Sequence, residues 1–366
     1  MKDTGSKKAE GAPTARKKPA TLADVAREAG VVAMTASRAI NGSGYVSTEV
    51  RERVLKAANL LNYRPNMLAR YLKGQRLNAV GIMLPDIANP FSAELVAGMK
   101  QVLDAAGYTA FIALSGTGIN DERSGLQSFV DHRVDGLLVA TRGTEAGDQM
   151  LAELSEQGIP MVTIGRPVEG TSVDCITADH YQGAFDVVTH LIGLGHKRIG
   201  FIGISPEDAM NLRRYQGYKA ALEKAGLDFT LDFTVGPANA PAFATQEDGY
   251  DGMMRLSEGK TRPTAVLARN DFAAIGALRA AVKLGWKVPK DIAIAGFDNI
   301  PLAAYWTPPL TTVLQPIREQ GKMAAQILLD RIEGRLKGPT KTHRLGCELI
   351  VRESTDPKAE TYSPAG

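Results

Sequence analysis

The 366-residue sequence contains only two cysteines, Cys175 and Cys347, so neither a disulfide framework nor a four-cysteine metal site is available. No apolar run approaches the roughly 20 residues that a membrane-spanning helix needs, and the basic N-terminus lacks the apolar core of a secretory signal. The five histidines are scattered without metal-ligand spacing. We therefore expect a cytoplasmic protein without a bound metal, a cofactor or a membrane partner.

Motifs that would indicate nucleotide binding or catalysis are also missing. Gly116-x-Gly118 follows an expected strand and Gly193-x-Gly195 is a second Gly-rich turn, but Asp121 and Arg198 stand where the dinucleotide fingerprint requires its third glycine. No phosphate-binding P-loop is present, and no nucleophile elbow surrounds any serine. Asp179 and His180 stand together at an expected helix start, where helix capping explains them better than catalysis. The sequence therefore does not predict an enzyme.

Charge is distributed unevenly along the chain. Residues 1–76 carry 15 Lys and Arg against 6 Asp and Glu, whereas the remaining residues carry 28 against 34. A basic module attached to a mildly acidic body is typical of a protein that binds a polyanion such as DNA. Residues 1–20 are rich in Lys, Ala, Gly and Pro and have almost nothing to bury, so we expect a disordered basic tail there.

Residues 21–41 predict two short helices joined by a tight turn. Thr21 can cap the first helix with its hydroxyl, and Asp24 lies where a carboxylate favours a helix N-terminus. Gly30 stands where a left-handed residue is needed to end that helix. A third helix follows, with Ser47 as its expected cap.

The second helix of this hairpin carries side chains suited to DNA. It alternates small residues with Thr35, Ser37 and Arg38 and ends at Asn41. Small residues let a helix lie deep in a major groove, hydroxyls reach phosphates, and the guanidinium of Arg38 can donate two hydrogen bonds to guanine. A purely structural hairpin would share much of this pattern, so the flanking residues must decide between the two.

The flanks complete a pattern that resembles the LacI family of bacterial transcription regulators. The chain reads TLADVAREAGVVAMTASR from residue 21, VSTEVRERV from residue 46 and LNYRPNMLARYL from residue 61. Val32 replaces the usual Ser of the family, Ala36 the usual Val and Val50 the usual Thr. Losing a Ser cap costs about 1 kcal/mol of helix stability, so we expect weaker DNA binding and an intact fold.

The resemblance implies roles for individual residues. The positions that match the DNA-contacting residues of the family are Thr21, Val32, Ala33, Met34, Thr35, Ser37, Arg38, Asn41, Asn66, Ala69 and Leu72. Residues 63–76 would form the hinge, whose paired helices lie in the minor groove of a palindromic operator. A leucine matching Leu72 wedges into a base step and kinks the duplex.

From residue 78 the pattern changes to short apolar runs separated by helical segments. The expected strands lie near residues 79–84, 109–114, 136–140, 161–165, 175–178, 199–203, 265–268 and 292–296. Strands and helices that alternate over this length predict two doubly wound parallel sheets. The expected fold is thus a small all-α helix-turn-helix domain followed by a two-lobed α/β core.

The resemblance extends into the core and implies a fold like the periplasmic sugar-binding proteins, in which the chain crosses between two lobes three times. It rests there on motifs that include Asn89-Pro90-Phe91, Asn270-Asp271 and Gly296-Phe297-Asp298. The boundaries expected on that template are a tail at 1–20, a helix-turn-helix domain at 21–62, a hinge at 63–76, an effector-binding and dimerisation core at 77–354 and a flexible tail at 355–366. The first lobe would comprise residues 77–166 and 315–338, and the second residues 167–314 and 339–354.

Polar residues after the strands of the second lobe define the expected effector site, because ligands of open α/β sheets bind at the carboxyl ends of the strands. Arg214, Asn270 and Asp298 offer a guanidinium, an amide and a carboxylate, which can hydrogen-bond the hydroxyls of a sugar. In the resembled family the matching positions contact the small molecule, and Phe91 would face it from the other lobe. Helix capping is the favoured structural explanation for Asp271, and a surface salt bridge is the alternative for Arg214.

Arg142, Arg166 and Arg269 also follow expected strands on the ligand side. Extra guanidinium groups would suit an anionic effector such as a sugar acid or sugar phosphate. Whether all three line the cleft stays open at this point, and we include Arg166 among the expected effector contacts.

These patterns predict a homodimeric, ligand-responsive regulator that binds double-stranded operator DNA and represses genes of carbohydrate or sugar-acid metabolism. LacI-like tetramers use a C-terminal leucine-heptad helix, but residues 352–366 contain no leucine and two prolines, so we expect a dimer. Two alternatives remain: a sugar-binding receptor without DNA binding, and a co-repressor-dependent regulator of another pathway.

Overall fold

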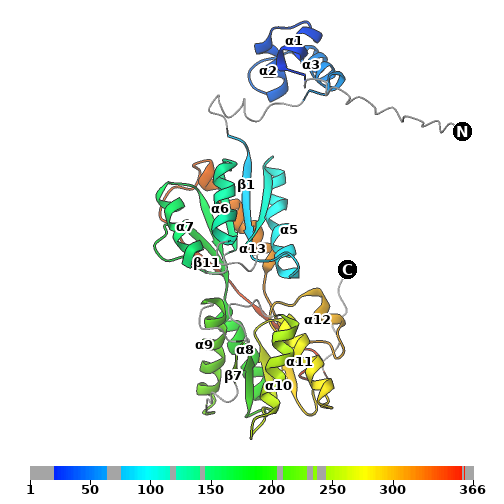
Figure 1. Ribbon diagram of the computed structural model, residues 1–366, viewed down its shortest axis with the longest axis vertical. Helices are drawn as coiled ribbons and strands as arrows, with labels where there is room; N and C mark the ends of the chain where they lie inside the picture. The colour runs from blue at the N-terminus through cyan, green and yellow to red at the C-terminus, as the bar shows by residue number, and fades with distance from the viewer. Residues whose placement is uncertain are drawn as a thin grey trace, which may run out of the picture. The chain divides into compact units, whose positions relative to one another are not determined.

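The chain divides into two compact units, residues 1–76 and residues 77–366 (Figure 1). The computed structural model describes residues 20–63, 76–115, 121–140, 145–203, 209–228, 234–236, 245–356 and 358. The expected basic tail up to residue 19, the hinge positions Asn66, Ala69 and Leu72, and Arg142 lie outside these residues. In the part of the chain that is described, no helix has both the length and the apolar character needed to cross a membrane.

Within residues 20–63 the chain forms three helices, α1 (Leu22–Glu28), α2 (Ala33–Asn41) and α3 (Thr48–Leu60). Each helix contributes a fully buried residue to a small shared core, namely Val25, Ala36 and Val54. Ala36, one of the departures from the family pattern, therefore lies in the core and not on the surface. The helix-turn-helix arrangement predicted from the sequence is confirmed.

The helix ends follow the expected capping chemistry. Thr21 and Asp24 form a reciprocal capping box, in which the hydroxyl of Thr21 accepts the N–H of Asp24 and the Asp24 carboxylate accepts the N–H of Thr21. Gly30 has a φ of +63°, which glycine adopts without strain, and Ser47 caps α3. Val32 precedes α2 and forms no side-chain cap, as expected from its replacement of serine.

In the described part of the first lobe, six parallel strands pair in the order β11-β5-β4-β3-β1-β2. They are β1 (Ala79–Leu84), β2 (Thr109–Leu114), β3 (Gly136–Ala140), β4 (Met161–Ile164), β5 (Asp174–Ala178) and β11 (Thr342–Leu345). One face packs against α5 (Pro90–Ala105) and α13 (Ile317–Ile332), and the other against α6 (Asp121–Asp131) and α7 (Glu145–Glu156) (Figure 1).

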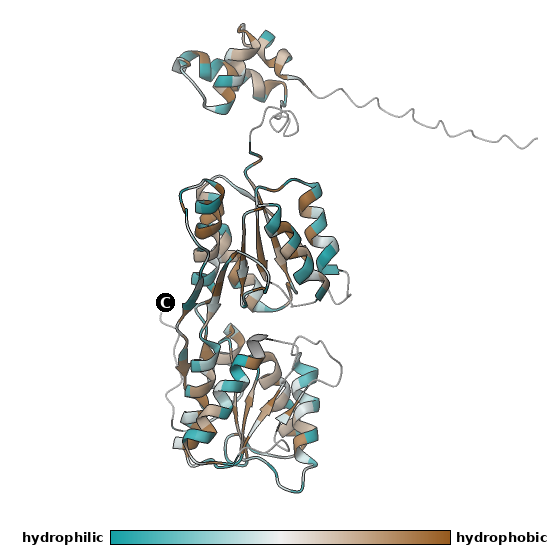
Figure 2. Cartoon of the chain, turned by 90° about the vertical axis from the view of Figure 1, so that its left-hand side faces the viewer, coloured by the Kyte–Doolittle hydropathy of each residue, from teal (hydrophilic) through white to brown (hydrophobic). Residues whose placement is uncertain are grey.

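Strand β1 shows why these segments read as continuous apolar runs. Ile82 and Leu84 pack with the helices of one face, whereas Met83 between them packs with those of the other. A strand covered on both faces needs apolar side chains at every position. Figure 2 shows the result, with hydrophobic strands enclosed by helices that are hydrophilic on their outer surfaces.

The second lobe repeats this construction. Its sheet has the order β7-β6-β8-β9, formed by β6 (Ile199–Ile202), β7 (Thr234–Val235), β8 (Ala265–Ala268) and β9 (Ala293–Ala295). One face packs on α8 (His180–Gly193) and α9 (Ala209–Lys224), and the other on α10 (Gln246–Ser257) and α11 (Asp271–Lys283). The short helix α12 (Pro301–Tyr305) and the antiparallel strands β10 (Thr312–Leu314) and β12 (Glu348–Ile350) complete it.

Three expected boundaries are wrong. Strands β5 and β11 were assigned to the second lobe, but β5 pairs with β4 and β11 pairs with β5 in the first sheet. The first crossing between lobes therefore follows Ala178 and not residue 166, and the last follows Leu345 and not residue 338. Thr355, which we expected in the flexible tail, is buried and shares a 2.7 Å hydrogen bond with Thr311.

Glycines allow the helices of the core to approach each other closely. Where α5 crosses α13, a Cβ on Gly98 would lie 2.1 Å from the carbonyl oxygen of Arg318, and a Cβ on Gly321 would lie 2.3 Å from that of Leu95. Both distances are far below van der Waals contact, and both obstacles are backbone atoms. Only glycine fits at this crossing without a shift of one helix.

We expect Gly98→Ala to lower the free energy of unfolding by about 1–3 kcal/mol, the usual cost of overpacking, measured by urea denaturation. Gly193→Ala is the matched control, because a Cβ at the end of α8 would meet nothing within 4 Å. It should be neutral or stabilise by up to about 1 kcal/mol. Equal stabilities of the two variants would show that α5 and α13 do not need their close contact.

Candidate functional site

Helix α2 presents the residues expected to contact DNA. Val32 and Met34 have 69% and 64% of their surface exposed, although both are apolar. Ala33 and Arg38 are exposed as well, while Ala36 faces the core. The helix thus has one buried face of small residues and one open face that carries the predicted base contacts.

Several polar residues around this face form hydrogen bonds within the helical domain. The side-chain amide of Asn41 donates to the hydroxyl of Ser37 at 3.2 Å, and the hydroxyl of Thr21 donates to Asp24 at 2.7 Å. Thr35 is half-buried. These local hydrogen bonds fix the side chains of Asn41 and Thr21 in the free protein.

A buried ion pair lies at the carboxyl ends of the strands in the second lobe. Arg214 of α9 and Asp298, which follows β9, are 6% and 5% exposed, and Nη2 of Arg214 lies 3.4 Å from Oδ1 of Asp298. Nη1 of Arg214 donates to the carbonyl oxygen of Arg269, and the guanidinium lies 4.0 Å from the centre of the Phe297 ring. The surface salt bridge considered as an alternative for Arg214 is therefore wrong.

Asp298 has a second donor and an unusual backbone. The side-chain amide of Gln315 donates to the same Oδ1 at 2.6 Å. Burial raises the pKa of Asp298, and the positive charge of Arg214 opposes that rise. Its φ of +113° lies where residues other than glycine are rarely found. Backbone strain of this kind is characteristic of binding sites.

Asn270 and Asp271 have roles that differ from those expected. Asn270 caps α11 by accepting a backbone N–H of its first turn at 2.9 Å. Asp271 is fully buried and accepts the N–H of Ile300 at 2.8 Å and the hydroxyl of Thr312 at 2.5 Å. Burial, together with the charge of Asp298, raises the pKa of Asp271 well above its ordinary value. Capping as the explanation for Asp271 is therefore wrong.

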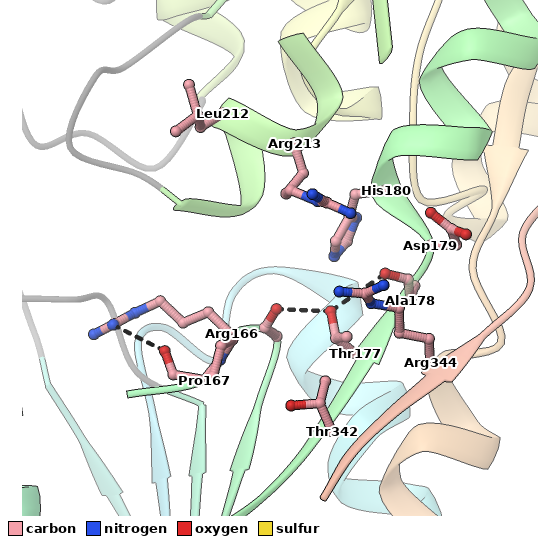
Figure 3. Close-up of a pocket in the computed structure, with 11 residues that line it drawn as sticks. Arg166, Pro167, Thr177, Ala178, Asp179, His180, Leu212, Arg213, Thr342 and Arg344 are labelled. Carbon is pink, nitrogen blue, oxygen red and sulfur yellow. Dashed lines mark hydrogen bonds between the residues drawn. The ribbon is translucent and has the colours of Figure 1, made fainter. Parts of the chain in front are cut away.

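A cavity of about 310 Å³ lies between the two lobes (Figure 3). The carboxyl ends of β4 and β5, strand β11 and the first turns of α8 and α9 form its walls. Its lining residues are Gly165, Arg166, Pro167, Thr177, Ala178, Asp179, His180, Leu212, Arg213, Thr342 and Arg344. The cavity lies at the carboxyl ends of parallel strands, but these are β4 and β5 of the first lobe and not the second-lobe strands from which the site was predicted.

The expected effector residues are divided between this cavity and its surroundings. Arg166 lines it, and Arg214 lies one side chain behind it, with Nε donating to Nδ1 of His180 at 3.4 Å. Asp298 joins this second layer through Arg214. Phe91 packs against the core of the first lobe and is not among the lining residues.

His180 is a site residue that the sequence analysis did not identify. The carboxylate of Asp179 accepts the N–H of Gln182 at 3.2 Å and caps α8, as expected. His180 is not a cap: it is 4% exposed, and its ring lies tilted against Phe297 at 5.8 Å between centres. The available signal was its position just after an apolar strand, which is shared by many residues without function.

The protonation of His180 follows from its neighbours. A guanidinium can only donate, so Nδ1 of His180 accepts from Arg214 and the ring proton is on Nε2. Burial, followed by the charges of Arg214 and Arg213, lowers the pKa of His180 well below its ordinary value. The ring is therefore neutral near pH 7 and offers an N–H donor.

Comparison with known proteins covers both units. Residues 21–66 match the family described as bacterial regulatory proteins, lacI family, and residues 188–355 match the periplasmic binding protein-like domain. The HTH-type transcriptional regulator DegA of Bacillus subtilis and the ribose operon repressor of Haemophilus influenzae are each 34% identical, over 92% of this chain and 98% of theirs. A crystal structure of the lac repressor dimer bound to operator and the anti-inducer ONPF is 26% identical, with a TM-score of 0.80 over 92% of this chain and 99% of that one.

We expect the pH dependence of stability to report His180. Its folded pKa is lowered, so its contribution is fully present above about pH 6.5 and is lost as the pH falls towards the folded pKa. In that window the free energy of unfolding falls by up to about 1.4 kcal/mol per pH unit for one such group. Thermal unfolding between pH 5 and 8 measures this slope.

His180→Gln should flatten the acid slope relative to the wild type. His132→Gln is the control, because it removes a histidine that is exposed on the first lobe and leaves the buried site intact. The same slope in His180→Gln and in the wild type would contradict the assignment of a buried neutral ring.

Proposed function

Because the chain belongs to the LacI family of bacterial regulatory proteins, we propose that it is a cytoplasmic, effector-responsive repressor that binds operator DNA as a homodimer. The observation that carries this proposal is the presence, in one chain, of an exposed α2 face and a ligand-sized cavity between two α/β lobes. The relatives named above are transcriptional regulators and not enzymes. The basic charge of residues 1–76 favours DNA binding over a receptor without DNA.

At the DNA, α2 lies in the major groove. Arg38 donates to a guanine, and the exposed side chains of Ala33 and Met34 contact thymine methyl groups. Two subunits read the two halves of a near-palindromic operator. The hinge residues Asn66, Ala69 and Leu72 are proposed to enter the minor groove at the operator centre.

At the cavity, the effector is a carbohydrate or a sugar acid. We assign the first contacts to lining residues such as Arg166, with Arg214, Asn270 and Asp298 as the polar layer behind them. Both hydrogen bonds described for Asp298 reach Oδ1, so its carboxylate holds Arg214 in place behind the lining residues. Effector binding shifts the core only through its different affinities for the two arrangements of the lobes.

A second pocket, with a volume of about 580 Å³, is the surface that we assign to the homodimer interface. It lies over α10, α11 and α12, and the aromatic side chains of Tyr250 and Trp306 line it. Glu247, Asp251 and Arg279 supply charges of both signs. In an isologous dimer each patch meets its own copy, so mixed charges around an apolar centre are self-complementary.

Arg38→Ala should weaken binding to the DNA upstream of the protein's own gene by about 1–3 kcal/mol and relax the preference at one guanine. Gel shifts on the operator and on scrambled DNA measure both effects. Arg27→Ala is the control, because Arg27 is exposed on α1 and paired with Asp24. An equal loss on both DNA sequences would make Arg38 a phosphate contact, and no binding by the wild type would contradict the proposed function.

Arg279→Glu should convert the dimer to a monomer, because it would add a third carboxylate to Glu247 and Asp251. Light scattering at micromolar concentration measures the mass in solution. Lys283→Glu makes the same charge change on α11 outside this surface and should remain dimeric. A dimer of unchanged stability in Arg279→Glu would place the interface elsewhere.

A further inference from the structure

Cationic side chains reach the cavity from both lobes. Arg166 and Arg344 belong to the first lobe, and Arg213 belongs to α9 of the second. Figure 3 shows Arg213 on one side of the space and Arg344 on the other, with His180 between them. Two guanidinium groups that face each other across a cleft repel unless a negative charge lies between them.

The carboxylates near the cavity do not neutralise these charges fully. Asp179 is the one carboxylate among the described lining residues, and it caps α8. Asp148 pairs with Arg166. Within the described part of the chain, neither Arg213 nor Arg344 forms a salt bridge, and the guanidinium of Arg213 lies 5.8 Å from the centre of the Tyr181 ring. Among the residues that the structure describes, the charge balance at the cavity is therefore positive.

The remaining polar groups suit a hydroxylated ligand. The N–H of His180 at Nε2 adds one more donor, because Nδ1 already accepts from Arg214. The hydroxyl of Thr177 donates to the carbonyl oxygen of Gly165 at 2.7 Å, which leaves its oxygen as an acceptor. Thr342 provides a further hydroxyl. Hydrogen-bond donors and hydroxyl groups thus line the same cavity.

We propose that this cavity binds a small anion of the sugar-acid or sugar-phosphate class, with Arg344 and Arg213 holding its carboxylate or phosphate from opposite lobes. The inference rests on the proposed function in taking this ligand as the effector. The inference assigns the preference for an anion to Arg344 and Arg213 and not to Arg269. The side chain of Arg269 lies against Gly203 and does not line the cavity. Without a ligand, the guanidinium groups of Arg344 and Arg213 repel each other. A bound anion attracts both, so binding favours the arrangement in which the two lobes lie close together.

The test is calorimetric titration of the full chain, without DNA, using two pairs of probes matched in carbon skeleton. D-gluconate is compared with D-glucitol, and D-glucose 6-phosphate with D-glucose. We expect at least one anion to bind about 10-fold or more tightly than its neutral partner, since hydrogen bonds to charged groups contribute that much. The two pairs distinguish a carboxylate from a phosphate ligand.

Arg344→Gln and Arg213→Gln should each weaken the anion about 10- to 100-fold and leave the neutral probe unchanged. Combining them should cost less than the sum of the two, because both hold the same ligand group. Arg262→Gln is the control, since Arg262 is exposed beside Trp286 before the amino end of β8, and it should bind like the wild type.

Three outcomes would overturn the inference: equal binding of charged and neutral probes, no binding of either anion, or anion affinity unchanged in both arginine variants. Operator binding by the wild type, measured separately without any ligand, reports the proposed function. A protein that binds its operator but does not prefer anions would contradict this inference alone.

Discussion

The desolvated pair of Arg214 and Asp298 is the interaction on which the centre of the core depends. Removing one partner of such a pair leaves a charge buried without compensation, at a cost of about 3–5 kcal/mol. Gln315, two residues before the helix α13 of the first lobe, donates a hydrogen bond to the carboxylate of this pair. One carboxylate therefore connects α9 and the end of β9 with a segment that crosses between lobes. His180 lies between this pair and the cavity, because its Nδ1 accepts from Arg214 and the residue lines the cavity.

The two units divide the physical work of the protein. The first unit has a core of small side chains, so its stability depends on caps and on a few buried contacts such as Val25 against Val54. Val32 and Met34 are among its exposed apolar residues, and they lie at the start of α2, the helix proposed to contact DNA. The second unit buries long apolar strands on both faces and keeps its polar groups for the ends of those strands. The unit that binds DNA and the unit that binds the ligand are thus stabilised in different ways.

Much of the fold was predictable because its signals are local. Caps such as Thr21, the left-handed Gly30 and continuous apolar runs such as β1 each identify an element from adjacent residues. The assignment of β5 and β11 to the first lobe was not predictable in this way, because parallel pairing depends on contacts between distant segments. A short apolar strand looks the same in either sheet.

The site was predictable in type more than in detail. The pairing of Arg214 with Asp298 agrees with their expected position after the strands, and the cavity contains Arg166. The roles of His180, Asp271 and Arg344 depend on which side chains surround each of them in the fold. The chemistry of a single residue in the sequence does not predict those neighbours. Asn270 and Asp271 are adjacent and both buried, yet Asn270 caps its own helix while Asp271 bonds to Ile300 and Thr312.

The pairing of β11 with β5 sets an order for biosynthesis. As the ribosome releases the chain, the three helices of residues 20–63 can fold as soon as they emerge, because their contacts are local. Neither lobe of the core is complete until the last residues follow, since β11 at residues 342–345 closes the first sheet and Ser354 bonds to Ile294 in the second. Arg344 arrives with this final segment. A nascent chain therefore carries a folded DNA-binding head before it has a ligand cavity, and responsiveness to effector is acquired only at the end of translation.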